Sequence, residues 1–184
     1  RNEDCCFGYR DSVFKNKVKG EYLISRVIYK LSKKPNYNIS YGAIEKQLEN
    51  MGIKDLSAKS VSDAVIAIRQ SKLPDPSKIG NSGSFFKNPI VTQSTFDSIK
   101  LKFPNVVAYP AGEDLMKLAA GWLIEQAGWK GKTYGNYGVH KNQALVLVNY
   151  GGASGKEIYD LSSRILDSIK EKFGVNLERE VNIY

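Results

Sequence analysis

Residues 69–89, RQSKLPDPSKIGNSGSFFKNP, join a helix-like run to a strand-like run. This stretch has three prolines, two glycines and four basic side chains, and Ser84 directly follows a glycine. Prolines restrict the backbone, whereas glycines let a ligand approach it closely. The composition therefore predicts the floor of an active site, where a phosphate and a reacting carbon both come near the backbone, with Ser84 at its centre.

The length and composition bound the protein class. A chain of 184 residues predicts one domain or one and a half, and a hydrophobic content of 42% is sufficient for a core. No apolar run approaches the roughly 18 residues that a membrane span requires. The opening, RNEDCC, does not resemble a signal peptide. Because the sequence starts at Arg1 rather than methionine, we expect a piece of a longer protein or a processed one.

The formal charge of +8 predicts an anionic partner such as nucleic acid, a membrane surface or a phosphorylated metabolite. The basic residues form no polybasic run, so we expect no nucleic acid and no membrane among the partners. Adjacent Cys5 and Cys6 could bridge each other only with strain. They are expected to be free thiols of a reducing compartment, here the cytoplasm. No cysteine or histidine spacing suggests a metal, and the lone His140 is expected to be structural.

The periodicity of the chain predicts alternating helices and strands with short connections, which is an α+β fold. We expect strands over 21–31, 90–93, 106–110, 143–149 and 175–184, with a loop at 128–138. We expect helices over 43–51 and 94–103, from Asp114 to Gly128, and from Ser154 to Gly174. A further helix is expected to begin at Ser60, with Asp63 as its capping partner. Ser154 and Glu157 have the spacing of a capping box. The period of two in strands places Glu178 and Glu180 on one face.

The candidate chemistry centres on Ser84. Hydrolysis by a pair of Ser84 and His140 has little support, because no third residue of a triad can be identified. A serine hydroxyl is a very poor acid unless it faces a strongly basic carbon and a cation stabilises the resulting alkoxide. Lys72 and Lys87 flank Ser84 in the sequence, although Lys87 is also a candidate for a solvated side chain. Glu180 is available to complete the site.

Two further candidates have alternatives. Arg10 has a guanidinium suited to a carboxylate, or it is a surface residue beside a helix capped by Asp11 and Ser12. Tyr41 either closes over a ligand or packs on the helix that follows. Three other residues are interpreted as structural: Trp122 and Trp129 as packing, and Glu178 as surface.

Six segments, taken in order, resemble the UDP-N-acetylenolpyruvoylglucosamine reductases, flavoenzymes that make UDP-N-acetylmuramate for peptidoglycan. They are YRDSVFK at 9–15, KLPDP at 72–76, GNSGSFFKNP at 80–89, KLAAGWLIEQAGWKG at 117–131, HKNQALVLVN at 140–149 and LEREV at 177–181. Tyr41-Gly42 is similar to the subgroup with a tyrosine-bearing loop. The NSGS of residues 81–84 departs by one residue from the commoner NAGS of the family.

The resemblance implies a domain organisation within the α+β fold. Residues 1–72 would be the C-terminal part of a second FAD-binding domain, and 73–175 the substrate-binding domain. Residues 176–184 would be a strand returning toward a first FAD-binding domain. In the family, the main FAD site precedes the region that is similar here, so no cofactor-binding residue is assigned. FAD is not expected to remain bound to this piece, and the piece alone should be inactive.

The resemblance also implies roles. NADPH would reduce FAD, and the reduced flavin would pass a hydride to the substrate, UDP-N-acetylglucosamine enolpyruvate. Ser84 is similar to the proton donor, and Arg10 and Glu180 to the residues that stabilise the enol intermediate. Five residues are similar to substrate contacts: Tyr41, Arg69, Lys72, Asn88 and Gln143. Two other functions stay open, a non-catalytic UDP-sugar-binding module and a basic nucleic-acid-binding domain.

Overall fold

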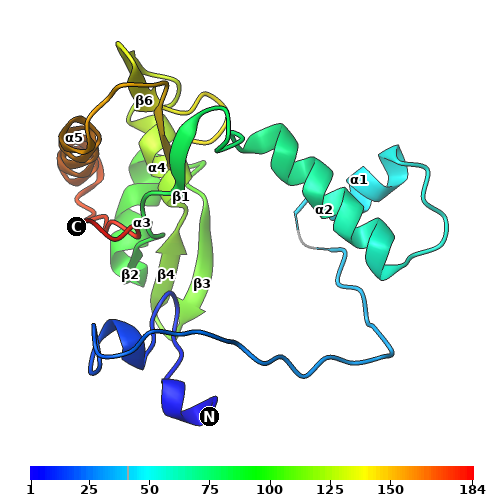
Figure 1. Cartoon of the computed structure of the whole chain (residues 1–184). Helices are drawn as coiled ribbons and strands as arrows, with labels where there is room; N and C mark the ends of the chain where they lie inside the picture. Colours follow the sequence, from blue (N-terminus) through cyan, green and yellow to red (C-terminus); the bar gives the residue numbers. More distant parts are fainter. Residues whose placement is uncertain (41) are drawn as a thin grey trace. The chain divides into compact units, whose positions relative to one another are not determined.

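The computed structural model describes residues 1–40 and 42–184. They form two compact units, Arg1–Asn38 and Ile39–Tyr184, which are treated separately (Figure 1). Both helices and strands occur, as the α+β prediction requires. In the described ranges, no helix is both long enough and apolar enough to cross a membrane.

The first unit has two short 3-10 helices, η1 (Glu3–Cys5) and η2 (Val13–Lys15). Ser12 is the N-cap of η2 but its side chain makes no capping hydrogen bond. The strand predicted over 21–31 is wrong, because those residues adopt no regular secondary structure. Their apolar side chains are exposed, with Leu23 at 94% and Ile28 at 95%. β propensity alone does not make a strand, since a strand needs a hydrogen-bonded neighbour.

The second unit begins with α1 (Ile44–Asn50) and α2 (Ala58–Lys72), which pack against each other. A capping box between Ser57 and Ser60 starts α2. The predicted partnership of Ser60 with Asp63 is therefore wrong, and Asp63 instead accepts a 2.6 Å hydrogen bond from Lys59, one helical turn earlier. The helix ends just before Pro74, whose ring cannot continue it.

Two antiparallel sheets follow (Figure 1). The larger has the order β1-β7-β6-β5 and contains β1 (Gly80–Ser84), β7 (Val146–Asn149), β6 (Tyr137–Val139) and β5 (Thr133–Tyr134). The smaller has the order β2-β4-β3 and contains β2 (Ile90–Thr92), β4 (Leu115–Leu118) and β3 (Ala108–Gly112). The predicted strands at 90–93, 106–110 and 143–149 are thus confirmed within a few residues.

Three predictions about these sheets are wrong. The helix expected from Asp114 to Gly128 is helical only over Ala120–Gln126, and its first part is a hairpin strand, β4, because Asp114 has φ +53° and turns the chain back onto β3. The loop expected over 128–138 contains the hairpin of β5 and β6. The final strand expected over 175–184 is reduced to one antiparallel bridge, between Arg179 and Phe86. The first two are tight hairpins whose turn residues were not recognised, and only the third joins residues distant in the sequence.

The remaining helices are α3 (Gln93–Lys102), α4 (Ala120–Gln126) and α5 (Gly155–Phe173). The predicted capping box of Ser154 and Glu157 starts α5, and Gly174 in the left-handed conformation ends it, as expected. Leu161, Ile165 and Ile169 are each at most 1% exposed. Burial of such side chains contributes roughly 1.5–3 kcal/mol each. This stripe packs α5 against β6 and β7.

Candidate active site

Ser84 is the last residue of β1 and is exposed to solvent. The pairing of β1 with β7 shifts register between Asn81 and Ser84. Gly83 makes this irregularity possible, since its φ of +72° is costly for other residues. The side chain of Asn81 supports the turn by accepting a 3.1 Å hydrogen bond from the Gly83 amide. The local sequence N-x-G therefore shapes the backbone that presents Ser84.

Glu180 lies on a segment that pairs with the residues immediately after Ser84. Its amide donates a 2.9 Å hydrogen bond to the carbonyl of Phe85, and the amide of Lys87 donates one of 2.9 Å to the carbonyl of Glu178. Glu180 is half-buried. The structure thus brings together the segments of two predicted catalytic residues, Ser84 and Glu180.

Lys87 is not a freely solvated side chain. Its Nζ lies 2.8 Å from Oε2 of Glu178, and the Lys87 side chain is only 30% exposed. The interpretation of Lys87 as solvated is therefore wrong. Glu178 is exposed, at 73% of its side chain, as expected for a surface residue. The ion pair directs this lysine toward the C-terminal segment.

Asn88 and Gln143 both lie at the first turn of α4. Oδ1 of Asn88 accepts a 2.9 Å hydrogen bond from the amide of Ala120. Oε1 of Gln143 accepts one of 3.4 Å from the amide of Leu145, and it would lie 3.5 Å from a Cβ placed on Gly121. The structure thus brings these two predicted substrate contacts to one place. It also shows that Asn88 helps to start α4, which the sequence did not reveal.

Arg69 lines a cavity of about 740 Å³ between the end of α2 and β1. Its other polar lining residues include Lys78, Asn81 and Asp75. Lys72 is exposed in the last turn of α2, and it is not among the described residues that line the cavity. The cavity therefore reaches from the predicted substrate contact Arg69 to Gly83, the neighbour of Ser84. Lys78 and Asn81 were missed from the sequence, although both lie within the glycine- and proline-rich stretch.

Two predicted residues cannot be placed against this site. Arg10 belongs to the first unit, where it has a φ of +55° and its carbonyl accepts a 2.9 Å hydrogen bond from Lys15 Nζ. Its approach to Ser84 stays a prediction. Tyr41 lies outside the described residues.

The two tryptophans pack in or against the core, as predicted. Trp122 packs edge-on against Phe103, with ring centroids 6.2 Å apart, and Trp129 is 8% exposed within the core. His140 is buried, and its desolvation, followed by the charge of Lys141, lowers the pKa of the imidazole. Among the described residues, no group of three acidic, histidine or cysteine side chains is arranged to hold a metal.

The comparison with protein families identifies the chain. Residues 75–184 match the family model described as UDP-N-acetylenolpyruvoylglucosamine reductase, C-terminal domain. The chain belongs to this reductase family. The matched range starts within the cavity-lining stretch and includes Ser84, Asn88, Gln143 and Glu180.

Curated relatives with the name UDP-N-acetylenolpyruvoylglucosamine reductase match nearly the whole chain. The protein of Flavobacterium johnsoniae is 55% identical over 183 residues, which are 99% of this chain and 54% of the relative. That of Pseudomonas savastanoi pv. phaseolicola is 54% identical over 182 residues, 99% of this chain and 53% of the relative. The chain thus spans about half the length of these reductases.

Among similar solved structures is the crystal structure of UDP-N-acetylenolpyruvylglucosamine reductase from Thermus caldophilus. It is 21% identical, with a TM-score of 0.41, and the match covers 68% of this chain and 34% of that one.

Proposed function

We propose that this chain supplies the substrate-binding part of a UDP-N-acetylenolpyruvoylglucosamine reductase, which makes UDP-N-acetylmuramate for peptidoglycan. The observation that carries the proposal is the pairing of Glu180 with Phe85, the residue after Ser84. It joins the backbone segments of two proposed catalytic residues that lie far apart in the sequence. The relatives named as this reductase, 55% and 54% identical, support the same reaction.

The reduction adds a hydride and a proton across the double bond of the enolpyruvyl group. We assign the proton to the Ser84 hydroxyl, whose exposed position at the end of β1 leaves it open to a ligand. A hydroxyl acts as an acid only where the alkoxide left behind is stabilised. Lys87 is paired with Glu178, so we do not assign that stabilisation to Lys87. Arg10 and Glu180 are proposed to stabilise the enol intermediate, as their similarity to the family implies.

The proposed substrate contacts surround the same floor. Arg69, on the cavity, and Lys72, in the same last turn of α2, would hold the diphosphate, since fixed cations suit a doubly charged group. Asn88 and Gln143, at the start of α4, and Tyr41 would contact the sugar nucleotide. The family suggests that residues 1–72 are part of an FAD-binding domain, that residues 73–175 are the substrate-binding domain and that residues 176–184 are a returning segment.

FAD and NADPH are the cofactor and electron donor that the family implies, and FAD would supply the hydride when bound. The pyrophosphate of a dinucleotide is typically bound at a helix N-terminus. In the described part of the chain, side chains of the protein already cap α2, α3 and α5, namely Ser57, Thr92 and Ser154, and Glu157 adds a carboxylate at α5. These termini do not fit a pyrophosphate, so we assign no FAD-binding residue and derive no step through FAD.

The reaction is proposed to take place in the cytoplasm. Cys5 and Cys6 are both free thiols, which supports a reducing compartment.

The test is Ser84→Ala in the full-length reductase. We expect loss of at least about 100-fold in reduction of the enolpyruvyl substrate, in line with the loss of a general acid, while reduction of the flavin by NADPH continues at the normal rate. Stopped-flow absorbance separates the two half-reactions. The matched control is Ser82→Ala, an exposed serine of the same strand that should leave both rates unchanged. Equal loss of both half-reactions in Ser84→Ala would contradict the assignment.

The cavity favours a second candidate, a UDP-sugar-binding module without catalysis. Arg69 gives it a cation beside a concave surface, and Lys78, whose Nζ lies 3.9 Å from Oδ2 of Asp75, is on the same lining. Calorimetric titration of UDP-N-acetylglucosamine into this chain tests it, with Arg69→Ala and Lys72→Ala expected to weaken binding. Lys59→Ala removes a charge from the other end of α2 and is the control. Binding by the chain together with no reduction of the enolpyruvyl substrate by the wild-type full-length protein would favour this candidate over the reductase.

A further inference from the structure

Arg179 stands between the two glutamates of the C-terminal segment but faces away from them. Residue 179 is the bridge partner of Phe86, whereas Glu178 and Glu180 are hydrogen-bonded to the residues on either side of Phe86. Alternation along extended chains sends successive side chains to opposite faces. The ion pair of Glu178 with Lys87 marks one face, and Arg179 occupies the other.

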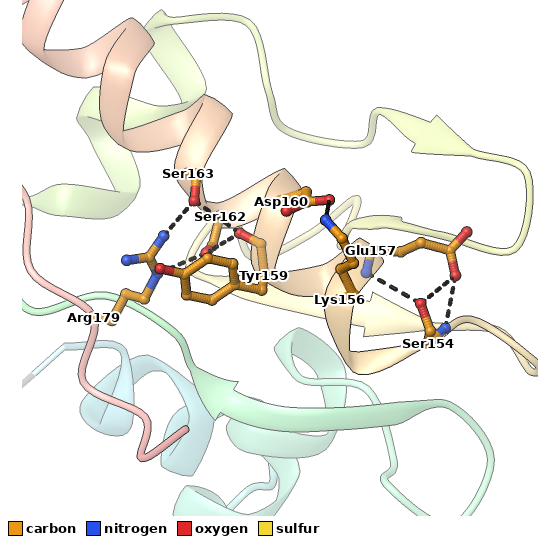
Figure 2. Close-up of polar contacts among 8 residues, drawn as sticks. All are labelled: Ser154, Lys156, Glu157, Tyr159, Asp160, Ser162, Ser163 and Arg179. Atoms are coloured by element: carbon orange, nitrogen blue, oxygen red, sulfur yellow. Dashed lines mark hydrogen bonds and ion pairs between the residues drawn. The ribbon is translucent and has the colours of Figure 1, made fainter. Parts of the chain in front are cut away.

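The guanidinium of Arg179 is held by α5 at three points (Figure 2). Its Nε donates a 2.7 Å hydrogen bond to Oγ of Ser162, and its terminal nitrogen donates one of 2.6 Å to Oγ of Ser163. Its central carbon lies 4.3 Å from the centroid of the Tyr159 ring. A planar guanidinium is suited to such a combination of two hydrogen bonds and ring stacking.

The two serine hydroxyls are oriented to receive Arg179. Arginine only donates hydrogen bonds, so each hydroxyl must send its own proton elsewhere. Both donate to the carbonyl of Tyr159, at 2.6 Å from Ser162 and 3.2 Å from Ser163 (Figure 2). Ser162 is fully buried, so its hydroxyl is fixed by packing as well. The acceptors are therefore in place on a helix that the core already holds rigid.

The C-terminal segment is fixed before Arg179 by the buried side chains of Val175 and Leu177 and by the ion pair of Glu178 with Lys87, and the contacts of Arg179 add an anchor at the residue next to Glu180. It forms one bridge and two backbone hydrogen bonds with residues 85–87, not a strand. Phe86, opposite Arg179, is 1% exposed and part of the core. A sideways shift of the segment would move Glu180 relative to Ser84, and the contacts of Arg179 with α5 oppose that shift.

We propose that Arg179 is a positioning residue, which fixes Glu180 beside Ser84 by tying the C-terminal segment to α5. This inference rests on the proposed function for its kinetic consequence. Misplacement of a catalytic group by about 1 Å costs up to roughly 100-fold in rate. Loss of Arg179 is therefore felt in the chemical step more than in substrate binding, because Arg69 and Lys72 lie on another element.

The kinetic test uses the full-length reductase with Arg179→Ala. The expected result is a fall in kcat of about 10- to 100-fold, a KM for the enolpyruvyl substrate within about twofold of wild type, and unchanged reduction of the flavin by NADPH. Arg179→Lys keeps the charge but cannot bond both serines while stacking on Tyr159, so it restores kcat only in part. A wild-type kcat in Arg179→Ala overturns the proposal, as does full rescue by lysine.

Arg164→Ala is the matched control. Arg164 also lies on α5 and stacks on aromatic rings, those of Tyr134 at 4.5 Å and Trp129 at 5.4 Å, and neither ring belongs to the C-terminal segment. It should keep the wild-type kcat. An equal loss in Arg164→Ala would mean that any weakening of α5 suffices and would overturn the specific role of Arg179.

A second measurement is independent of activity. In this chain, Arg179→Ala should accelerate amide hydrogen exchange at Glu180 and Lys87, measured by NMR, while Arg164→Ala should not. Unchanged exchange at both amides overturns the inference. If the wild-type reductase failed to reduce the enolpyruvyl substrate, the proposed function would fall, and the exchange measurement would still decide the role of Arg179.

Discussion

Residues 21–31 and residues 144–149 are both rich in apolar and β-branched side chains, yet only the second run contains a strand. Val146 and Val148 in β7 are fully buried, whereas Leu23 and Ile28 are almost fully exposed. β7 has β1 on one edge and β6 on the other, and α5 packs on it. In the described residues, no strand pairs with 21–31. The same composition therefore gives a core strand or an extended exposed run according to its neighbours.

The comparison also explains where the candidate site formed. β7 pairs with β1, and Ser84 is opposite Val146 in their register. The amide of Phe85 donates a 2.7 Å hydrogen bond to the carbonyl of Leu145, which holds the residue after Ser84 against the β7 run. A buried central strand thus supports the exposed serine.

The largest expected effect is that of Val148→Asp. An unpaired carboxylate at a fully buried position of β7 is expected to lower the free energy of unfolding by about 3–5 kcal/mol. Urea denaturation followed by circular dichroism measures the change. A loss under about 1 kcal/mol would mean that β7 is not the centre of the core.

The next effect is that of Gly138→Ala in β6. A Cβ at this position would lie 2.8 Å from Cα of Thr133 and closer still to the carbonyl oxygen of Lys132. Relief of that clash requires the hairpin of β5 and β6 to shift, at a cost of about 1–3 kcal/mol. Gly155→Ala, in the first turn of α5 with open space around it, is the control, and an equal loss there would contradict the explanation.

A smaller effect is expected from His140, which borders β7 because its amide donates to the carbonyl of Val146. Burial lowers the pKa of its imidazole, so the folded state disfavours protonation. The stability that depends on neutral His140 is present above its ordinary pKa near 6.5 and declines as the pH falls from there toward the lowered folded value.

The sequence contains one histidine, so a loss of stability in this pH range tests His140 directly. Urea midpoints between pH 7.5 and 5 should fall in the wild type, and the fall should be shallower in His140→Gln. Parallel curves for the two proteins would show that His140 does not cause the dependence.

The smallest effect is that of Ile28→Asp, the counterpart of Val148→Asp in the exposed run. The change in the free energy of unfolding of this chain should stay within about 0.5 kcal/mol, as for other exposed positions. The same urea assay applies. A loss comparable to that of Val148→Asp would show that residues 21–31 are buried in solution and would remove the distinction between the two runs.

The elements predicted well were those with local signals. The helix α5 has a Ser154–Glu157 box at its start, an apolar stripe at helical spacing and Gly174 at its end, all within one segment of chain. The strand β1 was missed because its sequence, GNSGS, has neither apolar alternation nor β propensity. It is a strand because the edge of β7 was available, and local patterns do not contain that information.

The sequence by itself determined the family, through motifs spread along the chain, and it named Ser84 and Glu180 as candidates. Only the tertiary structure placed the segments of these two residues side by side, paired Lys87 with Glu178 and turned Arg179 toward α5. The physical reason is that residue types and spacings are local properties of the chain. Hydrogen bonds between segments about 90 residues apart exist only after the core has fixed both of them.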